Sequence, residues 1–333
     1  MSHGKTVTHG RHTHGNGSMK FKPPLLPIMV LIAVAALLLY WRHWLHEQRV
    51  ADRVGNAPKP RSAVRATQHP AKLQESTSVE TTHYLITTAA SQDETRLVAK
   101  AVEHFHAAYT VFFKENIDST RAQNKLQLTL YKSQAQFKAN NRSIPWAEAY
   151  YLRPICYAYY ARGEPNPYHW MIHEATHQLN AEVAEFKKTK WIDEGLATYF
   201  GTSQIERGQL VPGKIDANTY PIWWLRDSEL TGSLDADIQS GRWIPIRALI
   251  TGKNAPHISS NVNRYYIQYW SLSHFLFHGK NGRYANAYRQ LIVEGGSLNN
   301  FEALIGPAEK IEYEWYRYLQ MTIKELKINR TNL

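Results

Sequence analysis

Cysteine is almost absent from this chain of 333 residues, which contains only Cys156. A single cysteine excludes an intrachain disulfide and a cysteine-rich metal site, so neither type of stabilised small domain is expected. Cys156 lies in an apolar run with strand character, which favours a buried and unreactive thiol. A catalytic thiol is the alternative that stays open at this point.

Acidic residues are scarce relative to basic ones. The chain has 28 Asp and Glu against 39 Lys and Arg, which gives a formal net charge of +11. The basic residues are spread along the chain, and we find no nucleic-acid-binding motif and no long Lys/Arg block in the part expected to fold. We therefore expect no nucleic-acid partner and interpret the charge as suited to an anionic membrane surface.

Long apolar runs are also rare, and the chain has one, at residues 25–41. Together with the residues up to 45 it is long enough to cross a membrane, and Tyr40, Trp41 and Trp44 lie where an interfacial aromatic belt would be. A cleavable signal peptide is the competing interpretation, but its small-residue site at 33–35 lies inside the apolar run. We predict an uncleaved transmembrane signal anchor over 25–45.

The anchor divides the chain into four predicted parts. They are a disordered, basic, His-containing tail (1–24), the anchor (25–45), a polar linker (46–80) and one folded domain (81–333). An N-terminal anchor before a large domain predicts a single-pass membrane protein with a cytoplasmic N-terminus and an extracytoplasmic domain. The sequence leaves the oligomeric state open.

The order of predicted elements indicates an α+β fold. Strands are expected over 83–88, 126–131 and 150–160. One helix is expected over 94–114, and a short second helix follows the strand at 126–131 and ends near 138. The rest of the chain reads as mostly helical. We therefore predict a mixed N-terminal sheet with an active-site helix, followed by a mostly helical C-terminal part.

The first motif of chemical interest places His173 and His177 four residues apart, with Glu174 between them. On a helix, residues i and i+4 lie one turn apart on one face, so both imidazoles can reach one ion. Glu174 then lies beside the ion without being a ligand, where its carboxylate can hold and deprotonate a water. A surface helix that happens to carry two histidines is the alternative.

A second motif, at residues 191–197, makes a metal site the better interpretation. Catalytic zinc typically keeps three protein ligands and one open position, and Glu194 can supply the third ligand. Gly195 and Ala197 are small, and we expect them to let this helix pack closely against the helix of His173. Asp193 and Thr198 flank the ligand, and Thr198 either orients a ligand histidine or is a plain packing residue.

His-Glu-x-x-His followed by Trp-x-x-Glu-Gly-x-Ala resembles the gluzincin zinc metallopeptidases, and most of all the uncharacterised peptidase-MA-like bacterial proteins. The resemblance covers about residues 82–318. It implies a zincin-like core of the thermolysin type and one Zn²⁺ held by His173, His177 and Glu194. It also implies Glu174 as the general base.

The resemblance further implies a tyrosine, at the start of a later helix, that stabilises the oxyanion. The match points to Tyr266, with Tyr265 and Tyr269 as rivals. His274 and His278 repeat the i, i+4 spacing without a carboxylate motif, so we expect them to be packing or surface residues.

The chain also departs from the family. The Gly-x-Met-Glu-Asn motif that holds a free N-terminus in the aminopeptidase-N branch is missing, and so is the thermolysin-type motif around the third ligand. The expected activity is therefore that of an endopeptidase on peptide or protein substrates, with the strand at 150–160 as a sheet edge for the substrate. Two alternatives stay open: a catalytically silent zinc-containing binding or scaffold protein of the envelope, and a metal-dependent amidase on an envelope polymer.

Overall fold

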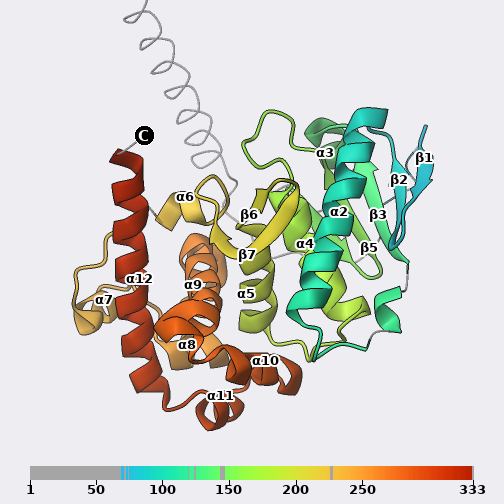
Figure 1. The fold of residues 1–333 in the computed structure, drawn as a ribbon. Helices are drawn as coiled ribbons and strands as arrows, with labels where there is room; N and C mark the ends of the chain where they lie inside the picture. Colours follow the sequence, from blue (N-terminus) through green and yellow to red (C-terminus); the bar gives the residue numbers. More distant parts are fainter. Residues whose placement is uncertain are drawn as a thin grey trace, which may run out of the picture. The chain divides into compact units, whose positions relative to one another are not determined.

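A computed structural model describes most of the chain beyond the predicted anchor (Figure 1). The described residues are 69–70, 73 and 75–331, without 119, 124, 143–146 and 226–227. The predicted tail, the predicted anchor and most of the predicted linker lie outside them. Within the described residues, no helix has both the length and the apolar character that a membrane span requires.

The N-terminal half is built on a mixed five-stranded sheet. Its neighbouring strands, in order across the sheet, are β1 (Thr77–Glu80), β2 (Tyr84–Thr88), β3 (Leu126–Tyr131), β5 (Ile155–Tyr159) and β4 (Tyr150–Leu152). The three inner strands are parallel, and each edge strand is antiparallel to its neighbour. Strand β1 starts within the range predicted as linker.

The prediction of a single strand over 150–160 was wrong. The segment forms a hairpin in which Leu152 pairs with Ile155 and Tyr151 pairs with Cys156. Arg153 and Pro154 make the turn, because proline has no N–H for a ladder and its fixed φ interrupts an extended strand. As a result β5 is an inner strand, and β4 forms the edge of the sheet on this side, opposite β1.

Strand β5 contributes side chains to a hydrophobic cluster on each face of the sheet. Cys156 and Ala158 face the main core, whereas Tyr157 and Tyr159 face a smaller cluster around Phe137 of α3 (Gln134–Asn140). This alternation is the period of two that a strand imposes. Cys156 is 1% exposed, which confirms the predicted buried thiol.

Helix α2 (Gln92–Phe112) packs against the main-core face of the sheet. It begins with a capping box between Ser91 and Glu94, and it buries Val98, Val102 and Phe105 on one stripe. Helix α4 (His169–Glu182) packs on β4 and β5 and continues this layer. The sheet therefore supports α4 through β4 and β5.

The C-terminal half is mostly helical, as expected. Its elements are α5 (Lys190–Gly201), the hairpin β6 (Ser203–Glu206) and β7 (Gln209–Ile215), α6 (Ile222–Leu225), α7 (Leu234–Gln239), α8 (Ile246–Thr251), α9 (Val262–Gly282), α10 (Ala285–Glu294), α11 (Leu298–Leu304) and α12 (Ala308–Thr331). Helix α5 lies between α4 and α9 and packs on both (Figure 1).

Two glycines let α5 approach both of its neighbours. A Cβ on Gly201 would lie 3.3 Å from the Cβ of His173 on α4. A Cβ on Gly195 would lie 2.3 Å from Ser273 Oγ and 3.0 Å from the Tyr269 carbonyl on α9. The expectation that Gly195 faces the helix of His173 was therefore wrong. A residue's partner depends on its side of the helix cylinder, and Gly195 lies on the α9 side.

Candidate metal centre

His173, Glu174 and His177 all lie on α4, at the middle of a helix that begins at His169. The two histidine side chains are 13% and 12% exposed, so they are largely shielded but still reachable. Their rings stand at a steep angle, with centroids 5.1 Å apart, as neighbours one helical turn apart do. The predicted i, i+4 geometry of the two imidazoles is therefore present.

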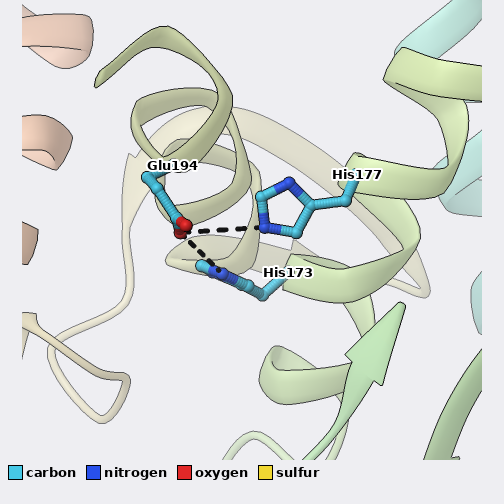
Figure 2. A group of neighbouring side chains, drawn as sticks. All are labelled: His173, His177 and Glu194. Atoms are coloured by element: carbon cyan, nitrogen blue, oxygen red, sulfur yellow. Dashed lines mark ion pairs between the residues drawn. The ribbon is translucent and has the colours of Figure 1, made fainter. Parts of the chain in front are cut away.

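Glu194 on α5 completes a group of three side chains that could hold a metal ion (Figure 2). Its Oε2 lies 3.6 Å from His173 Nε2 and 3.7 Å from His177 Nε2. Ligand atoms of a tetrahedral ion with bonds of about 2.1 Å lie about 3.4 Å from one another. The observed separations are close to that value, so an ion fits with little movement of the side chains.

The environment of Glu194 also fits a cation. Its Oε2 is buried and receives no well-formed hydrogen bond from the described residues. Burial by itself would raise the pKa of this carboxyl, but the nearby imidazole of His173 and the charge of His177 lower it. A buried, ionised oxygen without a hydrogen-bond donor costs free energy unless a positive group satisfies it.

Asp193 fixes the orientation of His177, which the sequence reasoning missed. Asp193 Oδ1 lies 3.0 Å from His177 Nδ1, on the far side of the ring from Glu194. Asn180 donates to the same carboxylate at 3.2 Å, and Lys188 Nζ lies 3.3 Å from its other oxygen. Burial acts to raise the pKa of Asp193, but His177 and Lys188 hold it far below its usual range. An ionised Asp193 keeps the proton on Nδ1 and leaves Nε2 free for a metal.

Thr198 does not contact either ligand histidine through its hydroxyl. Its Oγ1 donates to the Glu194 carbonyl at 2.6 Å, within α5 itself. The structure thus selects the packing alternative for Thr198. In the sequence, Asp193 is marked only by its position directly before Glu194. The packing of α4 against α5 shows that its carboxylate contacts Nδ1 of His177.

Glu174 lies between the metal ligands and the sheet edge. Its Oε2 accepts the backbone N–H of Tyr151, in β4, at 2.8 Å. Burial raises the pKa of the Glu174 carboxyl, and the charges of His173 and His177 offset part of that rise. One oxygen is therefore fixed by the sheet edge, and the carboxyl holds a proton more readily than an exposed glutamate does.

Of the three candidate tyrosines, Tyr266 lies at the site. Its ring centroid is 6.2 Å from that of His173. Burial first, and then the charge of Glu194, raise the pKa of Tyr266 well above its ordinary value, so its hydroxyl stays protonated. The hydroxyl of Tyr265 instead donates to the Pro256 carbonyl, and Tyr269 is 3% exposed within the helix packing.

His274 and His278 do not join this group. They pack against β7 and α12 and are held by hydrogen bonds to the Gly213 carbonyl, Tyr318 and Tyr199. His274 is buried and His278 is exposed, which confirms the prediction that they are packing or surface residues.

Comparison with known families gives one match. Residues 169–294 match a family described as a protein of unknown function (DUF1570). The matched segment begins with the first residue of α4 and ends with the last residue of α10, so it contains His173, Glu174, His177, Glu194 and Tyr266. No curated protein matches the chain.

Proposed function

We propose that the chain is a membrane-anchored, zinc-dependent endopeptidase of the gluzincin type. One observation carries the proposal: the imidazoles of His173 and His177 and the carboxylate of Glu194 converge, with Glu174 beside them on the same helix. Two of these groups have a supporting contact, His177 with Asp193 and Glu174 with the Tyr151 N–H, which a chance cluster on a surface helix lacks. The match to residues 169–294 assigns no chemistry, so the proposal rests on the site.

The donor set favours zinc. Two imidazole nitrogens, one carboxylate and no thiol make a three-ligand site that leaves a position for water or substrate. When bound there, zinc would polarise the substrate carbonyl and acidify a bound water. In metal sites, the ring nitrogen of a histidine that does not bind the ion usually contacts a carboxylate, as Nδ1 of His177 contacts Asp193 here.

Glu174 would move the proton. With one oxygen held by the Tyr151 N–H, the other is left to accept a proton from the attacking water and to deliver it to the leaving amine. Its raised pKa suits the first step, because the carboxylate of a weaker acid accepts a proton more readily. Tyr266 would donate a hydrogen bond to the oxyanion, since its hydroxyl stays protonated.

Strand β4 would bind the substrate. It is one of the two edges of the five-stranded sheet, and the backbone N–H of its Tyr151 bonds to the carboxylate of Glu174. An extended peptide could add to this edge through main-chain hydrogen bonds, which demand little of its side chains. The absence of the motif that holds a free N-terminus favours cleavage within a chain. Residues 25–45 would place the domain at a membrane, on the extracytoplasmic side.

The test is the substitution Glu174→Gln in the full-length protein purified in detergent. We expect the zinc content to stay at that of the wild type, while turnover of a quenched fluorescent peptide library falls by about 10²- to 10⁴-fold. The matched control is Glu182→Gln, two turns later on α4, where the carboxylate accepts a hydrogen bond from the Tyr151 hydroxyl. Equal turnover by wild type and Glu174→Gln on every peptide would overturn the proposal. It would favour the silent scaffold or, if cell-wall fragments were cleaved, the amidase.

A further inference from the structure

Three aromatic side chains gather next to the metal centre. We call Trp170, Tyr220 and Trp223 the aromatic cluster. The Trp170 and Tyr220 rings are stacked at 5.6 Å with an interplanar angle of 26°. The Trp223 ring stands across both, 6.3 Å from Trp170 and 5.9 Å from Tyr220. The three rings come from α4, the loop after β7 and α6, so the tertiary structure assembles them.

The aromatic cluster is continuous with the reacting centre. Trp170 lies three residues before His173 on α4, which places the two on neighbouring positions of one helix face. The Tyr220 ring lies 5.6 Å from Tyr266, whose ring in turn lies 6.2 Å from His173. A group bound against the cluster would therefore lie beside the bond that is cut.

The exposure of these rings distinguishes them from core aromatics. Trp191, Trp270 and Trp315 are each below 2% exposed and belong to the hydrophobic core. The three rings of the aromatic cluster are only partly buried, and Tyr220 and Trp223 are not members of the core. Aromatic faces held by one another and left partly open offer a surface on which a flat or apolar group can pack.

The charges around the cluster restrict what it can bind. The ring contacts of the cluster include no arginine or lysine over a face among the described residues. An acidic side chain or a terminal carboxylate packed on these rings would lose hydration without gaining a cation over a ring face, so a neutral group is favoured.

We propose that the aromatic cluster is the specificity site of the enzyme, and that it takes an aromatic or large aliphatic side chain of the peptide substrate next to the scissile bond. This inference rests on the proposed peptidase function. It predicts discrimination against acidic and small side chains at that position.

The test compares kcat/KM for quenched fluorescent peptides that differ at one position, with Phe, Leu, Ala or Glu next to the cleaved bond. Full-length, zinc-loaded wild type should prefer Phe and Leu over Ala and Glu by about ten- to a hundredfold. Trp170→Ala should remove most of that preference, measured within the variant as the ratio of kcat/KM for the Phe peptide to kcat/KM for the Ala peptide. Trp170→Leu, which keeps an apolar surface, should retain part of it. The control is Tyr313→Ala on α12, where the side chain is 59% exposed.

A second measurement separates this inference from the proposed function. Calorimetry on the zinc-loaded protein would compare acetohydroxamic acid with 3-phenylpropanohydroxamic acid, which chelate a metal alike and differ in the ring. Tighter binding of the phenyl compound that is lost in Trp170→Ala supports the aromatic cluster even if no peptide is cleaved. Glu174-dependent cleavage without any preference for Phe or Leu, or equal binding of the two hydroxamates, would overturn the inference. In the first case the proposed function would stand.

Discussion

Two pairs of histidines share the i, i+4 spacing, and they have different surroundings. His173 and His177 on α4 turn their Nε2 atoms toward one carboxylate of α5. Among the residues that the structure describes, no carboxylate bridges His274 and His278 on α9. Tyr318 and the Gly213 carbonyl hold the two nitrogens of His274, at 2.7 and 2.9 Å.

The difference lies in which nitrogen keeps a free lone pair. Both nitrogens of His274 are engaged as in a neutral, fully satisfied imidazole, and His278 Nε2 lies 2.8 Å from the Tyr199 hydroxyl. In the α4 pair, by contrast, Asp193 engages Nδ1 of His177 and leaves Nε2 facing Glu194. Spacing alone therefore does not make a metal site, because the neighbouring helix must supply a carboxylate in place of neutral partners.

Replacing one histidine of each pair should show the largest difference between the two pairs. In His177→Gln we expect the zinc content to fall from one ion per chain to near zero, because a two-ligand site loses most of its affinity. In His278→Gln the zinc content should match the wild type. Inductively coupled plasma mass spectrometry on protein dialysed against a weak chelator measures both. Zinc loss in His278→Gln with His177→Gln unaffected would reverse the assignment of the two pairs.

Lowering the pH should reduce the stability of the fold by protonating His274, which is buried in its neutral form. Burial and the neighbouring His278 lower the pKa of His274 to about 4 from its ordinary value of 6.5. The unfolded chain then binds more protons than the folded one between these values, so the stabilisation present above pH 6.5 is lost as the pH falls toward 4. The shift corresponds to a loss on the order of 3 kcal/mol.

Urea unfolding followed by tryptophan fluorescence, at pH 7 and pH 4 with a chelator present, would measure this loss. The wild type should lose more unfolding free energy than His274→Gln, which has no titrating group at this position. His169, whose pKa burial also lowers to about 4, is present in both proteins and cancels in the difference. Equal losses in the two proteins would show that His274 is not held neutral by the fold.

The smallest expected effect concerns Asp193, which contacts the metal ligand His177. In Asp193→Asn we expect zinc affinity to fall by about 10- to 100-fold, because a neutral amide no longer fixes the tautomer of His177. The matched control is Thr198→Val, which removes a hydroxyl that bonds only within α5. Competition with a fluorescent zinc chelator measures both affinities. An equal change in the two variants would assign Asp193 a packing role only.

The sequence predicted several elements well because local patterns specify them. The range expected for a helix at 94–114 is occupied by α2 (Gln92–Phe112), whose capping box and apolar stripe are both local signals. The strand expected at 126–131 is β3. The hairpin of β4 and β5 was missed because the whole segment has high strand character, and only Pro154 marked the reversal.

At the site, the sequence by itself determined which groups can bind a metal. Spacing on a single helix fixes His173, Glu174 and His177 relative to one another, and the nearby second motif supplied Glu194. Tertiary structure decided everything that depends on the sides of helices facing each other. It placed Gly195 against α9 and Gly201 against α4, put Asp193 behind His177 and brought Tyr220 beside Tyr266. The physical reason is that side chains project from a helix on all sides. Which of them meet a residue of another element is decided only by how the helices pack.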